Sequence, residues 1–226
     1  MSSGGQPPPA AQPPAVKICG VRRLADARLC LRHQVDEIGI NLYQRSKRYI
    51  ALAQAVAWLG GLAGSVRRVA VVVNEPLDAL LRVWASGCFE ALQLHGDEPP
   101  ELCRQLLERG IEVTKAFALA GPATVDTIDG YPAAVGILID AHVAGERGGT
   151  GVRADWELAA YCAERHPRRR LTLSGGLAPD NVAAAVDRVR PHAVDVASGV
   201  ESAPGVKDER MIEAFTRNAR AAGNAA

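Results

Sequence analysis

The sequence predicts one α/β domain, a (β/α)8 TIM barrel, and three observations carry this prediction. The chain of 226 residues is 48% apolar, which suits one large domain with a sizeable core. Eight short apolar runs alternate along it with longer segments of helical periodicity. The first turn, Cys19-Gly20-Val21-Arg22, lacks the G-x-G-x-x-G pattern that a doubly wound open sheet would place there.

Each predicted strand is a nearly continuous apolar run, as expected for parallel strands that are covered on both faces. The runs are Ala15–Cys19, Asp36–Leu42, Arg68–Val73, Phe89–Leu94, Ile111–Phe117, Val135–Asp140, Arg170–Ser174 and Ala193–Ser198. Helices are predicted between them, for example over Arg22–Gln34, Glu75–Gly87 and Glu98–Gly110, each ending near a glycine or a polar turn. Because only 4% of the residues are aromatic, Val, Ile, Leu and Ala are expected to fill the barrel interior.

The two ends of the chain differ in composition from the predicted barrel. Residues 1–14 include five prolines and no charged side chain, so this segment is predicted to be a disordered tail. The barrel is predicted to span residues 15–217. Residues 218–226, rich in Ala, Asn and Gly, are predicted to form a frayed C-terminus.

Charge, hydropathy and cysteine content exclude several classes of protein. With 26 basic and 25 acidic side chains, the chain has no charge excess for binding nucleic acid. No apolar run approaches the roughly 18 residues of a membrane span, and the N-terminus lacks a basic flank and an apolar stretch, so we expect a cytoplasmic protein that does not bind membranes. The five cysteines form no C-x-x-C pair, which predicts reduced thiols and no metal site.

In a barrel of this type, functional residues lie where the strands end. Lys17 and Cys19 share one face at the end of the first strand. A thiol beside a cation can lose its proton near neutral pH, so Cys19 is a candidate nucleophile or base. The alternative is that Cys19 is a small buried apolar residue, and the other four cysteines are interpreted in that way.

Asp140 closes the sixth predicted strand. Poor hydration there would raise the pKa of its carboxyl group toward values useful for a general acid. Asp140 could equally cap the next helix or pair with a basic side chain. The Gly148–Gly151 run that follows, with Gly149 in it, could fold over a substrate and offer backbone N–H groups.

Two glycine-containing turns follow the last two predicted strands. Gly175 and Gly176 follow the seventh, and Ser198 and Gly199 end the eighth. Barrels bind phosphate at this place through backbone N–H groups, although the glycines could also serve only to make tight turns. These turns predict a phosphorylated small molecule as the substrate.

Three polar residues follow the second, third and fourth predicted strands, namely Arg48, Asn74 and His95. Arg48 could bind a substrate carboxylate through its planar fork, or belong to a solvated charged turn. His95 could donate to a ligand, or only cap the following helix. Asn74 is a candidate of the same kind.

Seven motifs occur in order from about Val16 to Phe215 and together resemble the phosphoribosylanthranilate isomerase family of tryptophan biosynthesis. They are Lys-Ile-Cys-Gly, Ser-x-Arg-Tyr, Val-Asn-Glu-Pro, Gln-Leu-His-Gly-Asp-Glu, Asp followed by Gly-Gly-Thr-Gly-x-x-x-Asp-Trp, Ser-Gly-Gly-Leu-x-Pro-x-Asn-Val and Val-Asp-Val-x-Ser-Gly-Val-Glu. The chain departs from the family pattern at Lys47, where proline is usual, and at Ala197, where serine is usual. Ala197 would remove one hydroxyl from the phosphate neighbourhood.

The resemblance implies a cofactor-independent Amadori rearrangement of N-(5'-phosphoribosyl)anthranilate, in a (β/α)8 barrel. It implies that Asp140 is the general acid that opens the furanose ring and that Cys19 is the base that takes the C2' proton. Arg48 would hold the anthranilate carboxylate, and the two glycine turns would hold the phosphate. From their places at the strand ends, Lys17, His95 and Gly149 are also predicted to bind the substrate.

Other functions are less consistent with the motifs. An indole-3-glycerol-phosphate synthase would need a catalytic Lys and Glu pair, and a pentose-phosphate epimerase would need His and Asp metal ligands, and Lys-Ile-Cys-Gly argues against both. A barrel without catalysis, kept as a binding partner of neighbouring pathway enzymes, is the alternative from another class. Because no interaction segment stands out, we expect a monomer.

Overall fold

The computed structural model describes residues 12–140 and 154–222. Within them, eight parallel strands pair in chain order and close into a barrel, because β8 returns to β1. This arrangement confirms the predicted (β/α)8 fold. The strands are β1 (Ala15–Cys19), β2 (Glu37–Asn41), β3 (Arg67–Val72), β4 (Ala91–Leu94), β5 (Val113–Ala118), β6 (Gly136–Asp140), β7 (Leu171–Leu173) and β8 (Ala193–Val196).

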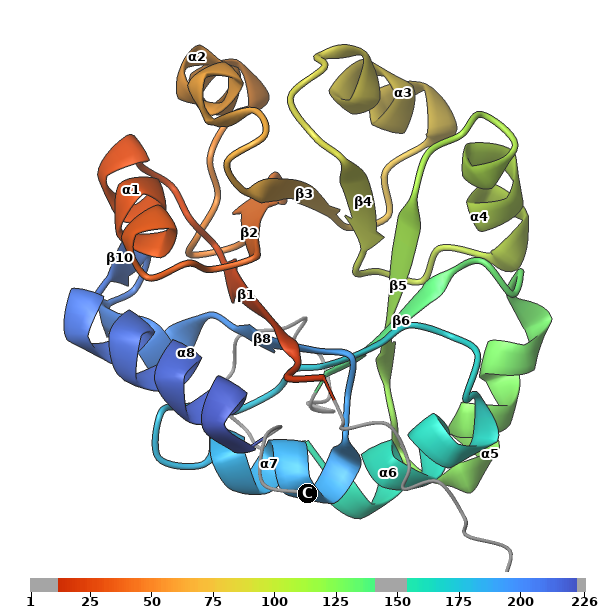
Figure 1. The fold of residues 1–226 in the computed structure, drawn as a ribbon. Coiled ribbons are helices and arrows are strands. Elements are labelled where there is room, and N and C mark those ends of the chain that lie inside the picture. The colour runs from red at the N-terminus through yellow and green to blue at the C-terminus, as the bar shows by residue number, and fades with distance from the viewer. Residues whose placement is uncertain (1–11, 141–153, 223–226) are drawn as a thin grey trace, which may run out of the picture.

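Helices form a ring around the strands (Figure 1). They are α1 (Leu24–Arg32), α2 (Leu52–Leu59), α3 (Leu77–Ala85), α4 (Pro100–Leu107), α5 (Pro122–Asp126), α6 (Trp156–Arg165), α7 (Val182–Val189) and α8 (Glu209–Ala222), with short 3-10 turns η1 (Gly60–Leu62), η2 (Thr127–Gly130) and η3 (Ser198–Val200). Every second strand residue, such as Ile18 on β1 and Ile38 on β2, is buried against these helices. The main hydrophobic core therefore lies between the barrel wall and the helices.

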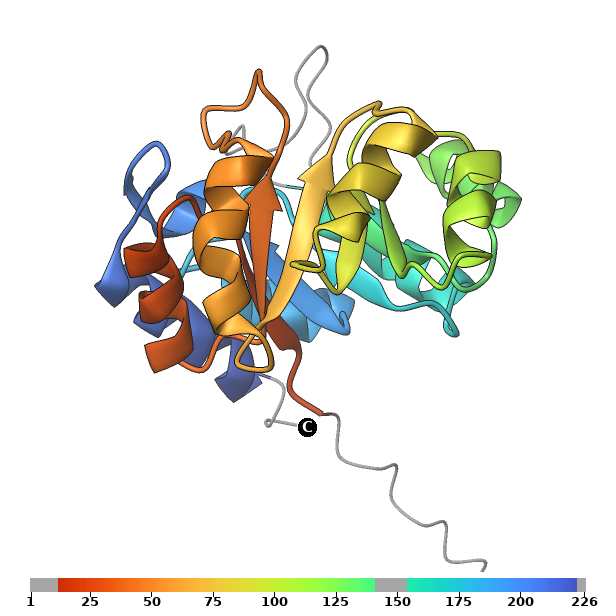
Figure 2. The same cartoon turned by 90° about the horizontal axis from the view of Figure 1, so that it is seen from above.

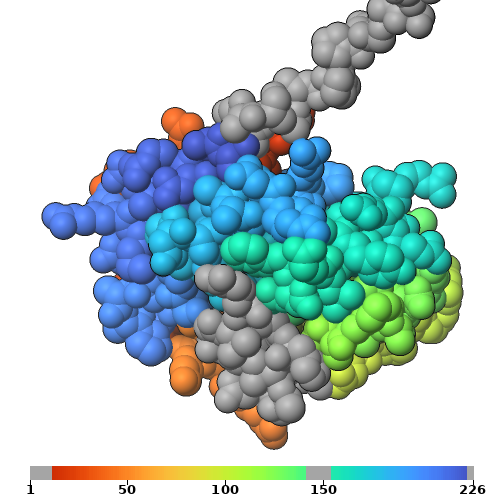
Figure 3. Space-filling view, turned by 90° about the horizontal axis from the view of Figure 1, so that it is seen from below, coloured from red at the N-terminus to blue at the C-terminus, as the bar shows by residue number. Residues whose placement is uncertain are grey.

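The last helix shows how the outer layer is attached. Ile212, Phe215 and Ala219 are buried on one face of α8, at the spacing of a helical stripe. This face contacts α7, α1 and β1, and α6, α7 and α8 lie side by side on one face of the molecule (Figure 3). The helix continues through Ala222, past residue 217 where the sequence predicts the barrel to end. Residues 1–11 of the predicted tail lie outside the described residues.

The barrel interior carries charged and polar side chains, and this corrects the expectation that Val, Ile, Leu and Ala fill it. Lys17 on β1 donates to Gln93 on β4, and Arg170 before β7 pairs with Glu37 on β2. These strands are not neighbours in the barrel, so the bonds cross its interior. Apolar side chains such as Val71 fill only part of the interior. Charged side chains and their partners fill the rest, since each buried charge requires an opposite charge or a hydrogen-bond partner beside it.

A two-stranded hairpin that the sequence does not predict follows β8. Its strands are β9 (Glu201–Ala203) and β10 (Val206–Lys207), which pair antiparallel. The hairpin projects from the same end of the barrel as the loop between β2 and α2, and the described chain begins at the opposite end (Figure 2). It thus adds side chains to the end where functional residues are expected.

Candidate active site

Cys19 and Asp140 are the last residues of β1 and β6. They are only 9% and 7% exposed, respectively. Since parallel strands all point the same way around a barrel, both residues lie at its C-terminal end. Lys17, on β1, and His95, the residue after β4, reach the same end of the barrel. The structure thus places Cys19, Asp140, Lys17 and His95 at the end where the sequence predicts them.

A chain of hydrogen bonds connects these residues across the barrel. The Nζ of Lys17 donates to Gln93 Oε1 at 2.7 Å and to Asp195 Oδ2 at 3.0 Å. Gln93 Nε2 lies 2.8 Å from Nδ1 of His95, and Nε2 of His95 lies 3.0 Å from Oδ2 of Asp140. The sequence prediction includes Lys17, His95 and Asp140 but misses Gln93 and Asp195, although each is a polar residue within an apolar strand.

The thiol of Cys19 has a raised pKa, chiefly because it is buried. Lys17 opposes this shift, Asp195 adds to it, and Lys207 and Arg48 oppose it further. The net effect is a raised pKa, which corrects the expectation that the neighbouring cation, Lys17, lets Cys19 lose its proton near neutral pH. Cys19 is therefore a thiol in the resting protein, held among three cations that favour the thiolate.

Lys17 and Asp195 form a fully buried ion pair beneath Cys19 and Asp140. Burial would lower the pKa of Lys17, but the attraction of Asp195, with smaller contributions from Cys19 and Glu37, raises it above its usual value. Burial raises the pKa of Asp195 although Lys17 opposes it, and the charge of Asp140 adds to that rise. The pair keeps a permanent ammonium group close to the thiol.

Arg48 is held by a carboxylate of the protein itself. Its Nε and Nη2 donate to the two carboxylate oxygens of Glu201, both at 2.8 Å. Lys207 Nζ donates to Glu201 Oε1 at 3.0 Å and to the backbone oxygen of Ala197 at 2.9 Å. The Arg48 guanidinium group, which the sequence predicts to bind a substrate carboxylate, thus already binds Glu201. The role of Glu201 was not predicted, although this residue ends the last motif. Burial would raise the pKa of Glu201, but Arg48 and Lys207 hold it below the usual range.

The two glycine turns lie against each other. Gly199 packs so closely on the loop after β7 that a Cβ built on it would lie 2.0 Å from the backbone oxygen of Leu177. Gly175 and Gly176 both have positive φ, 84° and 65°, a conformation that favours glycine. Asn181 holds this loop through both ends of its amide, donating to the Gly176 oxygen and accepting from Ala178 N–H, each at 2.9 Å. The structure therefore brings Gly175, Gly176, Ser198 and Gly199 together as predicted.

Two further candidates have different outcomes. Gly149 lies outside the described residues. Asn74 joins the loops after β3 and β4, because its Oδ1 accepts from Asp97 N–H at 2.6 Å and its own N–H donates to Glu98 Oε1 at 2.8 Å. These contacts give Asn74 a structural role in shaping the loops.

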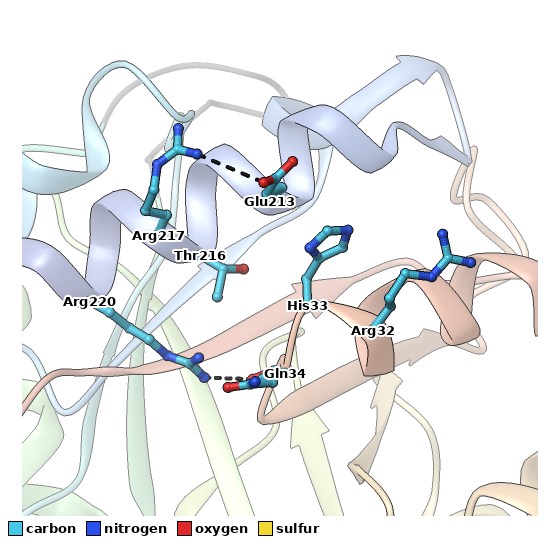
Figure 4. Close-up of a pocket in the computed structure, with 7 residues that line it drawn as sticks. All are labelled: Arg32, His33, Gln34, Glu213, Thr216, Arg217 and Arg220. Carbon is cyan, nitrogen blue, oxygen red and sulfur yellow. Dashed lines mark hydrogen bonds and ion pairs between the residues drawn. The ribbon is translucent and has the colours of Figure 1, made fainter.

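A groove between α1 and α8 lies away from this site (Figure 4). It is lined by Arg32, His33, Gln34, Glu213, Thr216, Arg217 and Arg220. Gln34 precedes β2, so the groove lies toward the N-terminal ends of the strands and contains none of the predicted site residues. Across residues 12–140 and 154–222, no three His, Cys, Asp or Glu side chains are grouped so that they could hold a metal ion. Within the same ranges, no helix combines the length and apolarity of a membrane span.

Comparison with known proteins identifies the family. A family model described as N-(5'phosphoribosyl)anthranilate (PRA) isomerase matches residues 16–218. The N-(5'-phosphoribosyl)anthranilate isomerase of Geobacter metallireducens is 40% identical over 207 residues, which cover 91% of this chain and 98% of that protein. The crystal structure of phosphoribosyl anthranilate isomerase from Thermotoga maritima matches with a TM-score of 0.82 at 39% identity, covering 92% of this chain and 99% of that one.

A second crystal structure adds a bound compound to the comparison. It is of a phosphoribosyl anthranilate isomerase in complex with reduced 1-(o-carboxyphenylamino)-1-deoxyribulose 5-phosphate, and it matches with a TM-score of 0.79 at 39% identity over 92% of this chain and 99% of that one. The matches span the whole barrel and agree with the motifs at the strand ends. The chain therefore belongs to the N-(5'-phosphoribosyl)anthranilate isomerase family, whose members are aldose-ketose isomerases.

Proposed function

We propose that this protein converts N-(5'-phosphoribosyl)anthranilate into 1-(2-carboxyphenylamino)-1-deoxyribulose 5-phosphate in tryptophan biosynthesis, without a cofactor. The observation that carries the proposal is the placement of Cys19 and Asp140, buried at the ends of β1 and β6, in one barrel mouth with two glycine turns. A related isomerase has been crystallised with a reduced form of that product, which supports the same chemistry here. That the protein is monomeric and cytoplasmic stays a prediction.

Asp140 is the general acid in this proposal. It protonates the furanose ring oxygen of the substrate, the bond from C1' to that oxygen breaks, and an iminium ion forms at C1'. The acid must deliver its proton in a poorly hydrated place, and Asp140 is almost wholly buried. His95 contacts one of its carboxylate oxygens, which leaves the group oriented by the protein before the substrate binds.

Cys19 is the base. Its thiolate removes the proton from C2' of the iminium ion, and the electron pair of that bond neutralises the nitrogen and leaves an enolamine. Proton transfer to C1' and loss of the hydroxyl proton at C2' then give the ketone. The cations of Lys17, Lys207 and Arg48 favour the thiolate against the cost of burial, and the positive iminium ion adds to that effect when it forms.

The other predicted residues hold the two anionic ends of the substrate. The N–H groups of Gly175, Gly176 and the Ser198-Gly199 turn would bind the phosphate at the place where barrels commonly bind it. Arg48 would contact the anthranilate carboxylate while Glu201 orients its guanidinium group. Lys17, His95 and Gly149 would complete the surroundings of the reacting sugar.

The proposed activity can be tested directly. Freshly prepared N-(5'-phosphoribosyl)anthranilate should lose its fluorescence when the purified protein is added, at a rate proportional to protein concentration. The matched blank is the Cys19→Ser/Asp140→Asn double variant, purified in the same way. Equal rates in the two samples, both at the spontaneous background, would contradict the proposed function.

Glu201→Gln should raise KM for the substrate about ten- to a hundredfold, with a smaller effect on kcat. The change removes the charged acceptor of Arg48, and hydrogen bonds to charged groups contribute about 1.5 to 3 kcal/mol, which corresponds to that range of affinity. Steady-state kinetics and a thermal unfolding curve should be measured together, since the change also leaves the buried ammonium of Lys207 without its carboxylate.

Two further variants separate orientation from stability. Glu201→Gln/Lys207→Met removes the buried cation as well, so it should recover much of the lost stability and keep the raised KM. Glu209→Gln alters a carboxylate that pairs with Arg32 on the surface and should leave KM unchanged. A KM near the wild-type value in both Glu201 variants would show that Glu201 does not position Arg48 for the substrate.

A further inference from the structure

The side chain of Gln93 lies inside the barrel, 1% exposed, between Lys17 and His95. Its Oε1 is 2.7 Å from Lys17 Nζ, and its Nε2 is 2.8 Å from His95 Nδ1. A lysine ammonium group can only donate hydrogen bonds, whereas an amide accepts through oxygen and donates through nitrogen. The amide of Gln93 is therefore fixed in one orientation, with its NH2 group toward His95.

The orientation of Gln93 determines which nitrogen of His95 carries a proton. Nδ1 faces an N–H donor at 2.8 Å, so it must be the acceptor and carries no hydrogen. In the neutral ring the proton then resides on Nε2, which donates to Asp140 Oδ2 at 3.0 Å. A doubly protonated ring would place two donors face to face within this buried contact.

Lys17 is held as a donor by its own surroundings. Asp195 Oδ2 accepts from Nζ at 3.0 Å, and this attraction keeps the pKa of Lys17 above its usual value although burial opposes it. Rotation of the Gln93 amide by half a turn would bring its NH2 group against the ammonium group and its oxygen against Nδ1. The bond from Lys17 therefore excludes the orientation that would favour a protonated Nδ1.

We propose that Gln93 is a positioning residue that, held by Lys17, keeps His95 in its neutral Nε2–H form, so that a neutral donor faces Oδ2 of Asp140. An imidazolium ion at 3.0 Å would favour the carboxylate over the carboxylic acid, and the neutral ring lacks that full charge. The inference rests on the proposed function of Asp140 as the acid, but the state of the ring does not.

Nitrogen NMR of protein labelled with 15N-histidine tests the inference without any assay of activity. The His95 signals are assigned by their loss in His95→Gln. At neutral pH we expect one protonated nitrogen, coupled to the ring carbons as Nε2, and one unprotonated nitrogen, Nδ1. A ring protonated at Nδ1, or at both nitrogens, would overturn the inference.

A charge-changing variant supplies the second test. Gln93→Glu places a carboxylate opposite Nδ1, so the ring should take up a second proton and show the imidazolium signature, and kcat should fall about ten- to a hundredfold with KM changed less than threefold. Gln54→Glu makes the same change at an exposed position on α2 and should leave both the ring and kcat unchanged. A neutral Nε2–H ring in Gln93→Glu would show that Gln93 does not control His95.

The two tests also separate the inference from the proposed function. An inactive wild-type protein with the Nε2–H ring would contradict the proposed function and leave the assignment of the ring in place. An active protein with any other ring state would contradict the assignment alone. If Gln93→Glu does not fold, the NMR spectrum of the wild-type protein decides the question by itself.

Discussion

Cys19→Ser should lower kcat by about a hundred- to ten-thousandfold and leave the fold intact. This range is the usual contribution of a general base, and a serine hydroxyl in the same place is far too weak an acid to supply the oxyanion. The substitution replaces one atom in a buried position, so the thermal unfolding midpoint should move by only a few degrees. Steady-state kinetics and a melting curve on the same preparation check both statements.

Cys88→Ser is the matched control, because Cys88 is also buried but precedes β4 at the other end of the strands. It should keep wild-type kcat. If Cys19→Ser kept full activity, the assignment of the base would be wrong. Cys19 also differs from the other buried cysteines in the charges around it. Lys17, Lys207 and Arg48 all oppose the rise in its pKa. At Cys162, whose pKa burial raises to about 11, only Arg169 does so.

The raised pKa of Cys19 predicts at which pH its thiol ionises, and Cys19→Ser should abolish this ionisation. The free protein needs the thiolate, and its fraction grows as pH rises toward a pKa above the ordinary thiol value. The ultraviolet absorbance of the Cys19 thiolate, taken as the difference between the wild-type protein and Cys19→Ser, should therefore still be rising above pH 8. A difference that reaches its plateau below neutral pH would contradict the raised pKa of Cys19.

The strands could be predicted from sequence because parallel strands covered on both faces are continuous apolar runs. All eight predicted runs contain an observed strand or overlap it within a few residues, and β1 matches at both ends. The ends of these strands then located Cys19 and Asp140. The fold and the candidate acid and base thus follow from patterns that are local in the chain.

The partners of these residues could not be predicted, because the contacts that define them are not local. Lys17 bonds to Gln93 and Asp195, 76 and 178 residues away, and Arg48 bonds to Glu201, 153 residues away. Only the closed barrel brings these side chains together. A polar residue inside an apolar run, such as Gln93, is the one local signal that the interior holds more than apolar side chains.

Asp140→Asn should lower kcat by about a hundred- to ten-thousandfold, the usual contribution of a general acid. The amide keeps a side chain of the same shape, and its oxygen can still accept from His95 Nε2, but it has no acidic proton for the ring oxygen. Binding of the product should change little, and calorimetric titration with the aminodeoxyribulose phosphate checks this. Asp78→Asn, at an exposed position on α3, is the control and should keep wild-type kcat.

The double variant Cys19→Ser/Asp140→Asn tests the order of the two proton transfers. Asp140 acts before the iminium ion forms and Cys19 acts after it, so each substitution raises the barrier of a different step. In consecutive steps the slower one limits the rate, and the double variant should then be about as slow as the slower single variant. If both transfers occurred in one transition state, the two losses would multiply instead. A multiplied loss would contradict a free iminium intermediate, and an unchanged rate in Asp140→Asn alone would show that another group protonates the ring oxygen.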